Sequence, residues 1–404
     1  MPNRRTVLKG LAGGIATSAA GLFIPRFVLA AELPAGAIEN GIFETLPGKK
    51  PLIKRSFRPP NFEAPINYFD EVITPNDKFF VRWHLANIPE VDLTAWRLSI
   101  GGDSVDRPFE LTMEQLRRDF EPVEVTAVCQ CSGNRRGLSD PHVAGVEWGY
   151  GAMGNAVWKG ARLKDILTKA GLKADALEIV FNGADQGAID KTPDFIKSIP
   201  VWKALDENSL IAYEMNGAPL PHLNGFPARI VIPGWTATYW MKQVVSIKAV
   251  PKPESGFWMS TAYRVPKGKF PLVDRFISQE AEANTPITEM VVNTLITSIK
   301  EGQRLNRHKP TMIKGIAWDA GFGIRTVEVS LDGGKVWQEA ELERDIGRFS
   351  FRAWHFPFAP GKAGKYHVMA KATNRQGTTQ PLDLIFNPPG YHNNVPQRIS
   401  VEVA

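Results

Sequence analysis

The pattern of apolar residues changes near residue 287, and this change restricts the possible folds more than any other feature of the chain. Beyond it, short stretches in which polar and apolar residues alternate recur at regular spacing, as is typical of half-buried strands. Residues 327–331 meet a turn sequence at 332–334, and residues 366–372 meet another at 374–377. About seven such strands in roughly 120 residues predict a β-sandwich of the immunoglobulin-like type.

The chain before this point combines short helices and strands in mixed order. Residues 111–120 predict a helix that Thr112 caps, and residues 163–170 predict a helix that Gly171 ends. Predicted strands cover residues 78–85, 123–131 and 176–182, and Asn216-Gly217 marks a hairpin turn. This mixture predicts an α+β domain.

Residues 32–65 are rich in proline and weakly periodic, which predicts an extended arm packed over the surface. We therefore predict an α+β domain over residues 32–268, followed by an all-β domain over residues 269–404. A chain of 404 residues is long enough to form two such cores.

The first 31 residues have the features of an export signal. A basic start is followed by small and apolar residues and by Ala30-Ala31, a small-residue cleavage site. The pair Arg4-Arg5, followed by Val7, Leu8 and Lys9, favours the twin-arginine route over an ordinary secretory signal. We therefore expect residues 1–31 to be a twin-arginine signal and the mature protein to be periplasmic.

Composition argues against two classes of protein. The formal net charge is +6, but four basic residues and no acid lie in the first 31 residues, which leaves +2 for the rest. No run of lysine and arginine with interleaved aromatics occurs, so we expect no nucleic-acid partner. No apolar run of about 18 residues follows the signal, so we expect no membrane segment in the mature form.

The chain has two cysteines, Cys129 and Cys131. Two residues apart on a strand, their side chains point the same way with Cα atoms roughly 6.5–7 Å apart, at the edge of disulfide geometry. A bridge between them would close almost no loop and would stabilise the fold little. A thiol pair kept so close in an oxidising compartment therefore indicates a chemical role.

Cys131 opens the segment with the most reactive side chains, residues 131–136. A thiol that leaves a strand beside two guanidiniums has its pKa lowered and can serve as a nucleophile or a metal ligand. The two arginines can bind an oxyanion through paired hydrogen bonds. Two cysteines do not complete a structural zinc site, and no Cys-x-x-Cys-His heme motif occurs. The spacing alone is equally compatible with a buried, inert cysteine.

The segment Cys131-Ser132-Gly133-Asn134-Arg135-Arg136 closely resembles the Cys-(Ala/Ser)-Gly-Asn-Arg-Arg signature of sulfite oxidases. Further matching segments follow in the family's order: residues 80–84 (Phe-Val-Arg-Trp-His), 151–167, 213–217 (Tyr-Glu-Met-Asn-Gly) and 225–234, with Lys242 beyond them. The resemblance spans nearly the whole mature chain. We therefore identify the chain as similar to the sulfite oxidase family.

This resemblance implies a molybdenum cofactor, in which a pterin dithiolene (molybdopterin) holds the metal. Cys131 would be the protein's thiolate ligand to molybdenum, whereas Cys129 would be only a small buried residue. The pterin and its phosphate would be held by Phe80, Val81, Arg82, Trp83, His84, Asp185, Asn224, Arg229, Trp240, Met241 and Lys242. The catalytic pocket would be formed by Arg82, Arg136, Trp148 and Tyr263.

The resemblance also implies an activity and partners. The protein would be a sulfite dehydrogenase that oxidises sulfite to sulfate and passes electrons to a separate periplasmic cytochrome c. The chain has no counterpart of the heme domain of animal enzymes, so we expect no heme in it. The C-terminal domain mediates dimerisation in the family, which implies a homodimer. The alternatives are a molybdenum-dependent reductase of compounds such as methionine sulfoxide and, more distantly, a cofactor-free binding protein.

Two positions depart from the family pattern. Relatives commonly carry an arginine after Trp-Asn-x, where this chain has Pro389. Either His392, Arg398 or another loop supplies the third positive charge, or the pocket is less cationic. Asn224 replaces a histidine found in some members and is a weaker partner for phosphate.

Overall fold

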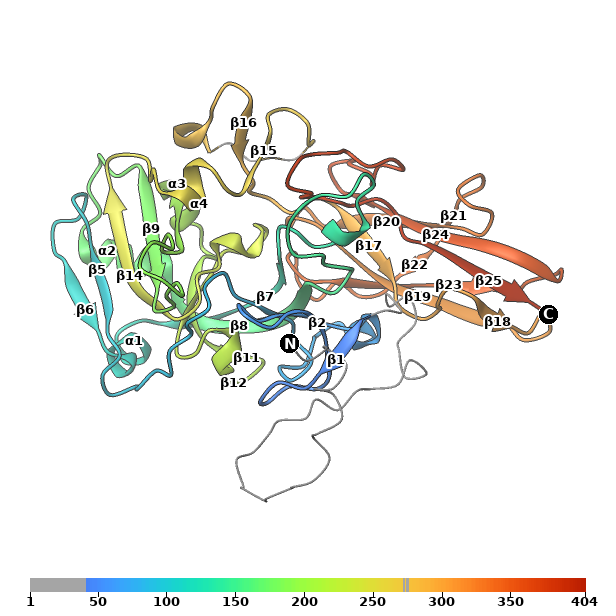
Figure 1. Ribbon diagram of the computed structural model, residues 1–404, viewed down its shortest axis with the longest axis horizontal. Helices are drawn as coiled ribbons and strands as arrows, with labels where there is room; N and C mark the ends of the chain where they lie inside the picture. Colours follow the sequence, from blue (N-terminus) through green and yellow to red (C-terminus); the bar gives the residue numbers. More distant parts are fainter. Residues whose placement is uncertain (1–40, 272, 274–275) are drawn as a thin grey trace, which may run out of the picture.

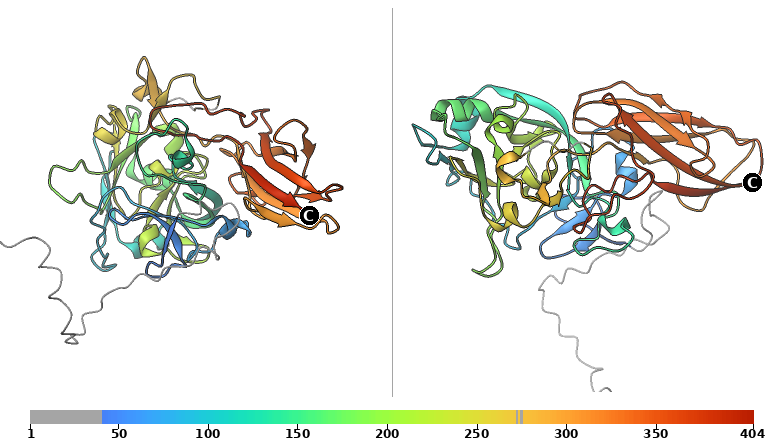
Figure 2. Two further views of the ribbon diagram at one scale, coloured as in Figure 1. Left: turned by 45° about the vertical axis from the view of Figure 1, so that its right-hand side comes forward. Right: turned by 90° about the horizontal axis from the view of Figure 1, so that it is seen from above.

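The computed structural model describes residues 41–271, 273 and 276–404. The predicted export signal, residues 1–31, lies outside these residues, as do residues 32–40 of the predicted arm. The described chain forms two bodies, an α+β body and a β-sandwich that ends at the C-terminus (Figure 1). The two views in Figure 2 also show the sandwich beside the α+β body. Within the described ranges, no helix has the length and apolar character needed to cross a bilayer.

The described chain begins with a four-stranded antiparallel sheet. Its strands, in order, are β1 (Ile42–Glu44), β2 (Leu52–Ser56), β3 (Asn61–Glu63) and β4 (Val81–Arg82). The prediction of an extended arm over residues 32–65 is therefore wrong for its described part, which forms three paired strands. The physical reason is that apolar side chains such as Leu52 and Phe62 find a common cluster with Trp83. β4 is shorter than the predicted strand 78–85, because only two of its residues pair with β3.

Two larger sheets form the rest of the α+β body. The first has the order β10 (Ile196–Pro200), β9 (Glu178–Gly183), β14 (Val244–Val250), β5 (Leu98–Gly101), β6 (Phe109–Leu111). The second has the order β12 (Ala218–Pro219), β11 (Leu210–Met215), β8 (Met153–Arg162), β7 (Pro122–Gln130), with β13 (Arg229–Val231) paired to β11. The connections contain α1 (Met113–Arg118), α2 (Leu163–Ala170), α3 (Val201–Ala204) and α4 (Phe257–Ser260). β15 (Arg264–Pro266) pairs with β16 (Asn284–Pro286).

Capping and turn chemistry confirm several predicted elements. The Thr112 hydroxyl accepts a hydrogen bond from the Gln115 N–H at 3.1 Å, and the Gln115 side chain accepts one from the Thr112 N–H, which completes a capping box for α1. α2 covers the predicted residues and ends at Gly171, whose φ is 70°. Asn216 and Gly217, with φ values of 54° and 74°, form the tight turn between β11 and β12. β7 matches its predicted range to within a residue at each end.

The C-terminal body consists of two facing sheets. One has the order β17 (Asn293–Ile296), β19 (Thr311–Trp318), β23 (Arg352–Phe358), β22 (Glu341–Leu342). The other has the order β18 (Gln303–Leu305), β25 (Arg398–Val403), β24 (Gly364–Asn374), β20 (Ile324–Ser330), β21 (Gln338–Glu339). Apolar residues of both sheets, such as Ile313, Val327 and Val368, form the core between them. The predicted sandwich is confirmed, and the domain boundary between residues 268 and 269 stays a prediction.

The two bodies share one core behind the end of β7. The Phe351 ring from the C-terminal body packs edge-on against Phe69, with ring centroids 5.9 Å apart. The Trp318 indole N–H donates to the side-chain oxygen of Gln130 at 2.7 Å. The strand that leads into Cys131 is therefore supported by both bodies.

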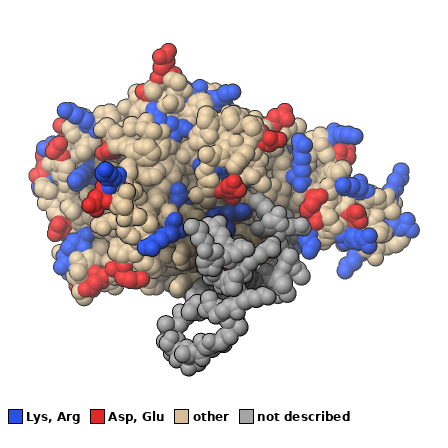
Figure 3. Space-filling model, viewed as in Figure 1, with Lys and Arg blue, Asp and Glu red and all other residues tan. Residues whose placement is uncertain are grey.

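The outer surface carries charges of both signs. Lysine, arginine, aspartate and glutamate side chains are interspersed over the face shown in Figure 3. Ion pairs such as Arg117–Glu214, at 2.8 Å, join them on the surface. A different distribution is found inside the α+β body, where several cations surround a single pocket.

Candidate active site

One pocket brings together most of the side chains predicted to carry chemistry. Its empty space, open solvent at the mouth included, is about 510 Å³. Its lining consists of Phe79, Phe80, Arg82, His84, Cys129, Cys131, Ser132, Phe195, Leu223, Asn224, Arg229, Ala237, Thr238, Trp240, Lys242 and Tyr263. The predicted site residues among them are Phe80, Arg82, His84, Cys131, Asn224, Arg229, Trp240, Lys242 and Tyr263.

Cys131 lies where the chain leaves β7. Its backbone N–H donates to the Ala152 carbonyl at 2.9 Å, and its own carbonyl accepts from the Asn134 N–H at 3.0 Å. The Asn134 side-chain oxygen in turn accepts from the Ala152 N–H at 3.0 Å. The backbone that carries the thiol is therefore held on both sides, and the thiol faces the pocket although the residue is buried.

The two arginines of the motif have different environments. Arg135 has φ 69°, in the left-handed region, and is buried. Its guanidinium donates to the carbonyl oxygens of Thr294 at 2.7 Å and Val395 at 3.1 Å, both in the C-terminal body, and lies 5.0 Å from the ring centroid of Tyr150. Burial lowers the pKa of Arg135 to about 10, so the side chain stays charged at neutral pH. Arg135 therefore joins the two bodies.

Arg136 lies close to the pocket but not in its lining. Its Nε donates to the Pro389 carbonyl at 2.7 Å, and its guanidinium lies 5.1 Å from the ring centroid of Tyr391. A Cβ at Gly133 would lie 2.6 Å from an Arg136 guanidinium nitrogen, so the glycine leaves room for the arginine to fold back over the motif. Arg136 is thus a neighbour of the predicted substrate pocket rather than part of its wall.

The Tyr263 hydroxyl connects two other predicted site residues. Arg82 Nη2 donates to it at 3.5 Å, and His84 Nε2 shares a hydrogen bond with it. Burial lowers the pKa of His84 well below its ordinary value, and Arg82 lowers it further, so the imidazole is neutral. Burial raises the pKa of Tyr263 against the opposing effect of Arg82, so the phenol keeps its proton. A neutral phenol in this position can donate a hydrogen bond to an oxyanion.

A cationic end of the pocket is formed by Arg229 and Lys242. Arg229 Nη1 donates to the Asn224 carbonyl at 2.9 Å. Burial lowers the pKa of Lys242 to about 7 and Arg229 lowers it further, whereas Asp185 opposes the shift. Gly225 has φ 111°, and a Cβ there would lie 3.1 Å from Lys242 and 3.2 Å from Arg229. The glycine therefore lets the two basic side chains lie close together.

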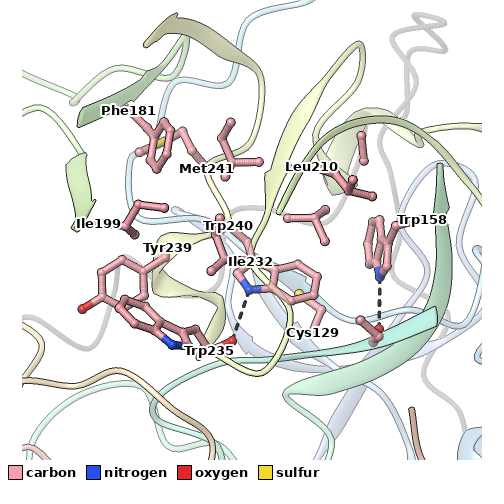
Figure 4. Packing of buried hydrophobic residues seen from close by; sticks show 14 of the residues in the cluster. Cys129, Trp158, Phe181, Ile199, Leu210, Ile232, Trp235, Tyr239, Trp240 and Met241 are labelled. Carbon is pink, nitrogen blue, oxygen red and sulfur yellow. Dashed lines mark hydrogen bonds between the residues drawn. The ribbon is translucent and has the colours of Figure 1, made fainter. Parts of the chain in front are cut away.

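Trp158, Trp240 and Cys129 contact Arg229 at this cationic end. Figure 4 shows these three residues among other buried apolar side chains. The indole N–H groups of Trp158 and Trp240 donate to backbone carbonyls at 3.0 and 3.1 Å. The Arg229 guanidinium lies 4.9 Å from the ring centroid of Trp158, and its Nη2 donates to the Cys129 sulfur at 3.7 Å. Cys129 is buried and unbridged, as expected. It is more than a small buried residue, however, because it lines the pocket and contacts Arg229.

The remaining predicted site residues lie behind the lining: Val81, Trp83, Trp148, Asp185 and Met241, together with Arg136. The Trp83 ring lies 4.4 Å below the Lys242 ammonium, measured to the ring centroid. Burial raises the pKa of Asp185 to about 6, against the effect of Lys242. Trp148 is fully buried, and nothing among the described residues accepts a hydrogen bond from its indole N–H. None of these residues forms part of the pocket wall.

Sequence reasoning missed several residues that the fold brings to the site. Those in the lining are Phe79, Ser132, Phe195, Leu223, Ala237 and Thr238. Lys197 lies just outside, with its ammonium 5.1 Å from the ring centroid of Tyr263. Tyr391 stacks on Tyr263 with ring centroids 5.5 Å apart. A lysine between isoleucines in a short strand is a signal that points to Lys197, whereas nothing local marks Tyr391.

The third positive charge expected near Pro389 is not supplied by the two candidates from the sequence. Burial lowers the pKa of His392 to about 3, so its ring is neutral. Arg398 is exposed on β25 and lines a separate cavity. Neither His392 nor Arg398 therefore brings a positive charge to the pocket of Cys131.

Comparisons with known proteins identify the family of the chain. Residues 84–258 match the family described as oxidoreductase molybdopterin binding domain, and residues 284–404 match the Mo-co oxidoreductase dimerisation domain. Mitochondrial sulfite oxidase of Macaca fascicularis is 35% identical over 375 residues, which cover 89% of this chain and 67% of that protein. Sulfite oxidase of Arabidopsis thaliana is 32% identical over 379 residues, which cover 87% of this chain and 94% of that protein. The chain belongs to the sulfite oxidase family.

A solved structure supports the same architecture for this member of the sulfite oxidase family. The crystal structure of the sulfane dehydrogenase SoxCD from Paracoccus pantotrophus superimposes with a TM-score of 0.72 at 24% identity, and covers 98% of this chain and 96% of that chain. A molybdopterin-binding domain is followed by an all-β domain of the dimerisation type. The predicted fold class is therefore confirmed.

The pocket residues fit the molybdenum cofactor of the sulfite oxidase family. Cys131 offers a soft thiol ligand, and Arg229 and Lys242 offer cations for a phosphate. Arg229 Nε and the Thr238 hydroxyl are buried, and neither has a hydrogen-bond partner among the described residues. Unpartnered buried polar atoms at a pocket wall are expected where a polar ligand binds. The described part of the chain has no group of three or more His, Cys, Asp or Glu placed to hold a metal ion.

Proposed function

We propose that this protein is a sulfite dehydrogenase that oxidises sulfite to sulfate. The observation that carries the proposal is that Cys131, Arg82 and the protonated phenol of Tyr263 line one pocket in a chain of the sulfite oxidase family. Sulfite is a small oxyanion, which a guanidinium attracts and orients through charge-assisted hydrogen bonds. The same pocket offers a thiol ligand and a cationic end for the cofactor.

The side chains of the pocket would divide the work of binding and orienting the substrate. The molybdenum cofactor, when bound, supplies the two-electron redox chemistry and the transfer of oxygen. Arg82 would hold one oxygen of sulfite, and the Tyr263 hydroxyl would donate a hydrogen bond to a second oxygen. With Nε2 protonated, the neutral His84 donates to the phenol oxygen and leaves the phenol hydrogen for the substrate. Phe195, stacked on His84 with ring centroids 3.6 Å apart, fixes the imidazole plane.

The electron acceptor and the location belong to the same proposal. Electrons would pass one at a time to a separate periplasmic cytochrome c. Arg4 and Arg5 would direct export by the twin-arginine route. Replacing both with lysine should leave the protein in the cytoplasm, as cell fractionation would detect.

The deciding experiment is sulfite-dependent reduction of ferricyanide and of cytochrome c by the exported protein, with bound molybdenum assayed in parallel. Sulfite turnover that scales with bound metal is the expected result. Bound metal without sulfite turnover, together with reduction of methionine sulfoxide, would replace this proposal with the reductase alternative. We expect molecular oxygen to be a poor electron acceptor. Sulfite-dependent oxygen uptake as fast as cytochrome c reduction would contradict the proposal that cytochrome c is the acceptor.

Tyr263→Phe should lower kcat/KM for sulfite by about a hundredfold, the typical cost of removing one hydrogen-bond donor aimed at a reacting oxyanion. Only the hydroxyl is lost, so the stacking with Tyr391 remains. Steady-state kinetics at saturating cytochrome c measures the effect. Tyr391→Phe is the matched control and should stay near wild type, because that hydroxyl contacts neither Arg82 nor His84. Equal losses in both variants would refute the specific role of Tyr263.

A further inference from the structure

A lysine from the N-terminal sheet contacts the cationic end of the pocket. Lys49 lies between β1 and β2 and is only 6% exposed. Its ammonium donates to the side-chain oxygen of Asn224 at 2.5 Å and to the Asn76 carbonyl at 2.6 Å. Lys49 precedes the molybdopterin-binding family match, which begins at residue 84. A charged group so far from the matched segment therefore contacts a residue of the pocket wall.

Lys49 fixes the orientation of the Asn224 amide. The amide oxygen accepts from Lys49, and the amide nitrogen donates to the Phe80 carbonyl at 3.1 Å. The backbone carbonyl of Asn224 accepts from Arg229 Nη1 at 2.9 Å. An amide with both ends engaged cannot rotate without losing a hydrogen bond. Asn224 thus connects Lys49 to Phe80 and Arg229, which both line the pocket.

The local backbone holds the lysine in this position. Gly48, with φ 70°, allows the turn that directs the Lys49 side chain inward. The N–H of Lys50 donates to the Asp77 carbonyl at 2.8 Å. The turn is therefore attached to the segment that runs directly into Phe80.

Three basic side chains, Lys49, Arg229 and Lys242, lie around this end of the pocket. Burial lowers the pKa of Lys49 to about 7, against the opposing effect of Asp77. Burial also lowers the pKa of Lys242 to about 7, and Arg229 lowers it further. Buried cations are costly unless a counter-charge accompanies them. A phosphate group placed among these side chains would supply that charge.

We propose that Lys49 is a positioning residue for the phosphate end of the molybdenum cofactor and that it acts through the Asn224 amide. An amide has an acceptor at one end and a donor at the other, so Asn224 serves a phosphate only when its orientation is fixed. Lys49 supplies this orientation from outside the molybdopterin-binding match. The inference rests on cofactor binding and is independent of the identity of the substrate.

The test uses the cofactor-loaded protein and the variants Lys49→Met, Asn224→Ala and the double variant. The rate of pterin release into the small-molecule fraction, followed by fluorescence of the oxidised pterin, is the readout, and no sulfite is needed. Lys49→Met should accelerate release by about tenfold or more, the typical effect of losing a residue that orients a cofactor ligand. Lys50→Met removes an exposed lysine next to it and is the matched control, with release as in wild type.

Non-additivity distinguishes an indirect from a direct role. If Lys49 acts through Asn224, the double variant should release pterin no faster than Asn224→Ala alone. The proposal would be overturned if the two single substitutions multiplied their effects on the release rate in the double variant. It would also be overturned if Lys49→Met released pterin at the wild-type rate. Lys49→Gln keeps a neutral donor for the Asn76 carbonyl and serves where Lys49→Met does not fold. Accelerated release by this variant supports the proposal, and wild-type release contradicts it. Failure of sulfite turnover with normal release would refute only the proposed activity.

Discussion

Cys131→Ser should lower sulfite turnover by at least about a thousandfold and leave the fold intact. Losing a residue that merely orients a metal ligand costs roughly 10–100-fold, so losing the ligand itself should cost more. Serine has nearly the shape of cysteine, and the backbone of Cys131 is held by Ala152 and Asn134 whatever the side chain is. The physical change is therefore confined to the replacement of a soft thiolate by a weakly acidic hydroxyl.

Three measurements check this expectation. Steady-state kinetics gives the turnover per bound molybdenum, circular dichroism gives the fold, and the visible spectrum should lose its thiolate-to-metal charge-transfer absorption. Cys129→Ser is the matched control, because Cys129 lines the same pocket and contacts Arg229 rather than the proposed metal position. It should keep most of the turnover. An active, metal-loaded Cys131→Ser variant would refute the ligand assignment.

Arg135→Met should lower the free energy of unfolding by about 2–4 kcal/mol, since two hydrogen bonds from a buried, charged donor are lost. The guanidinium donates to the carbonyl oxygens of Thr294 and Val395, and methionine leaves both without this donor. The substitution also removes the desolvation cost of a buried charge, which offsets part of the loss in the free energy of unfolding. The pKa of Arg135 stays near 10, so the loss should not change between pH 6 and 8.

Urea unfolding followed by tryptophan fluorescence measures this effect. Arg398→Met is the matched control. Arg135 and Arg398 line the same cavity between the two bodies, but Arg398 is exposed. Its stability should stay within about 0.5 kcal/mol of wild type. If Arg135→Met unfolded like the control but abolished sulfite turnover, Arg135 would be a substrate residue and not a link between the bodies.

Much of the fold could be predicted because its signals are local. Thr112 and Gly171 mark helix ends, and Asn216-Gly217 marks a turn, through the chemistry of a few adjacent residues. The alternation beyond residue 287 predicted the sandwich for the same reason. The strands within residues 32–65 were missed, because prolines in the turns hide a short alternation whose apolar partners lie further along the chain.

Only some features of the candidate site could be predicted from the sequence. Cys131, Arg82 and Tyr263 were identified because their segments resemble a family signature, and they do line one pocket. Local sequence did not distinguish Arg135 from Arg136, since the direction of each side chain depends on a left-handed residue and on carbonyls far along the chain. The partners of each arginine, in the C-terminal body, are more than 100 residues away in sequence.

The amino-acid order alone determined many of the elements, the two-domain plan and the family, because capping, alternation and motif spacing act between residues close in sequence. Tertiary structure alone decided which residues share a pocket with Cys131, which arginine joins the bodies, and that Lys49 contacts Asn224. Burial, which shifts the pKa values of Lys49, His84 and Lys242, likewise arises only when distant segments exclude water together. Such effects depend on distances in space that no short stretch of sequence encodes.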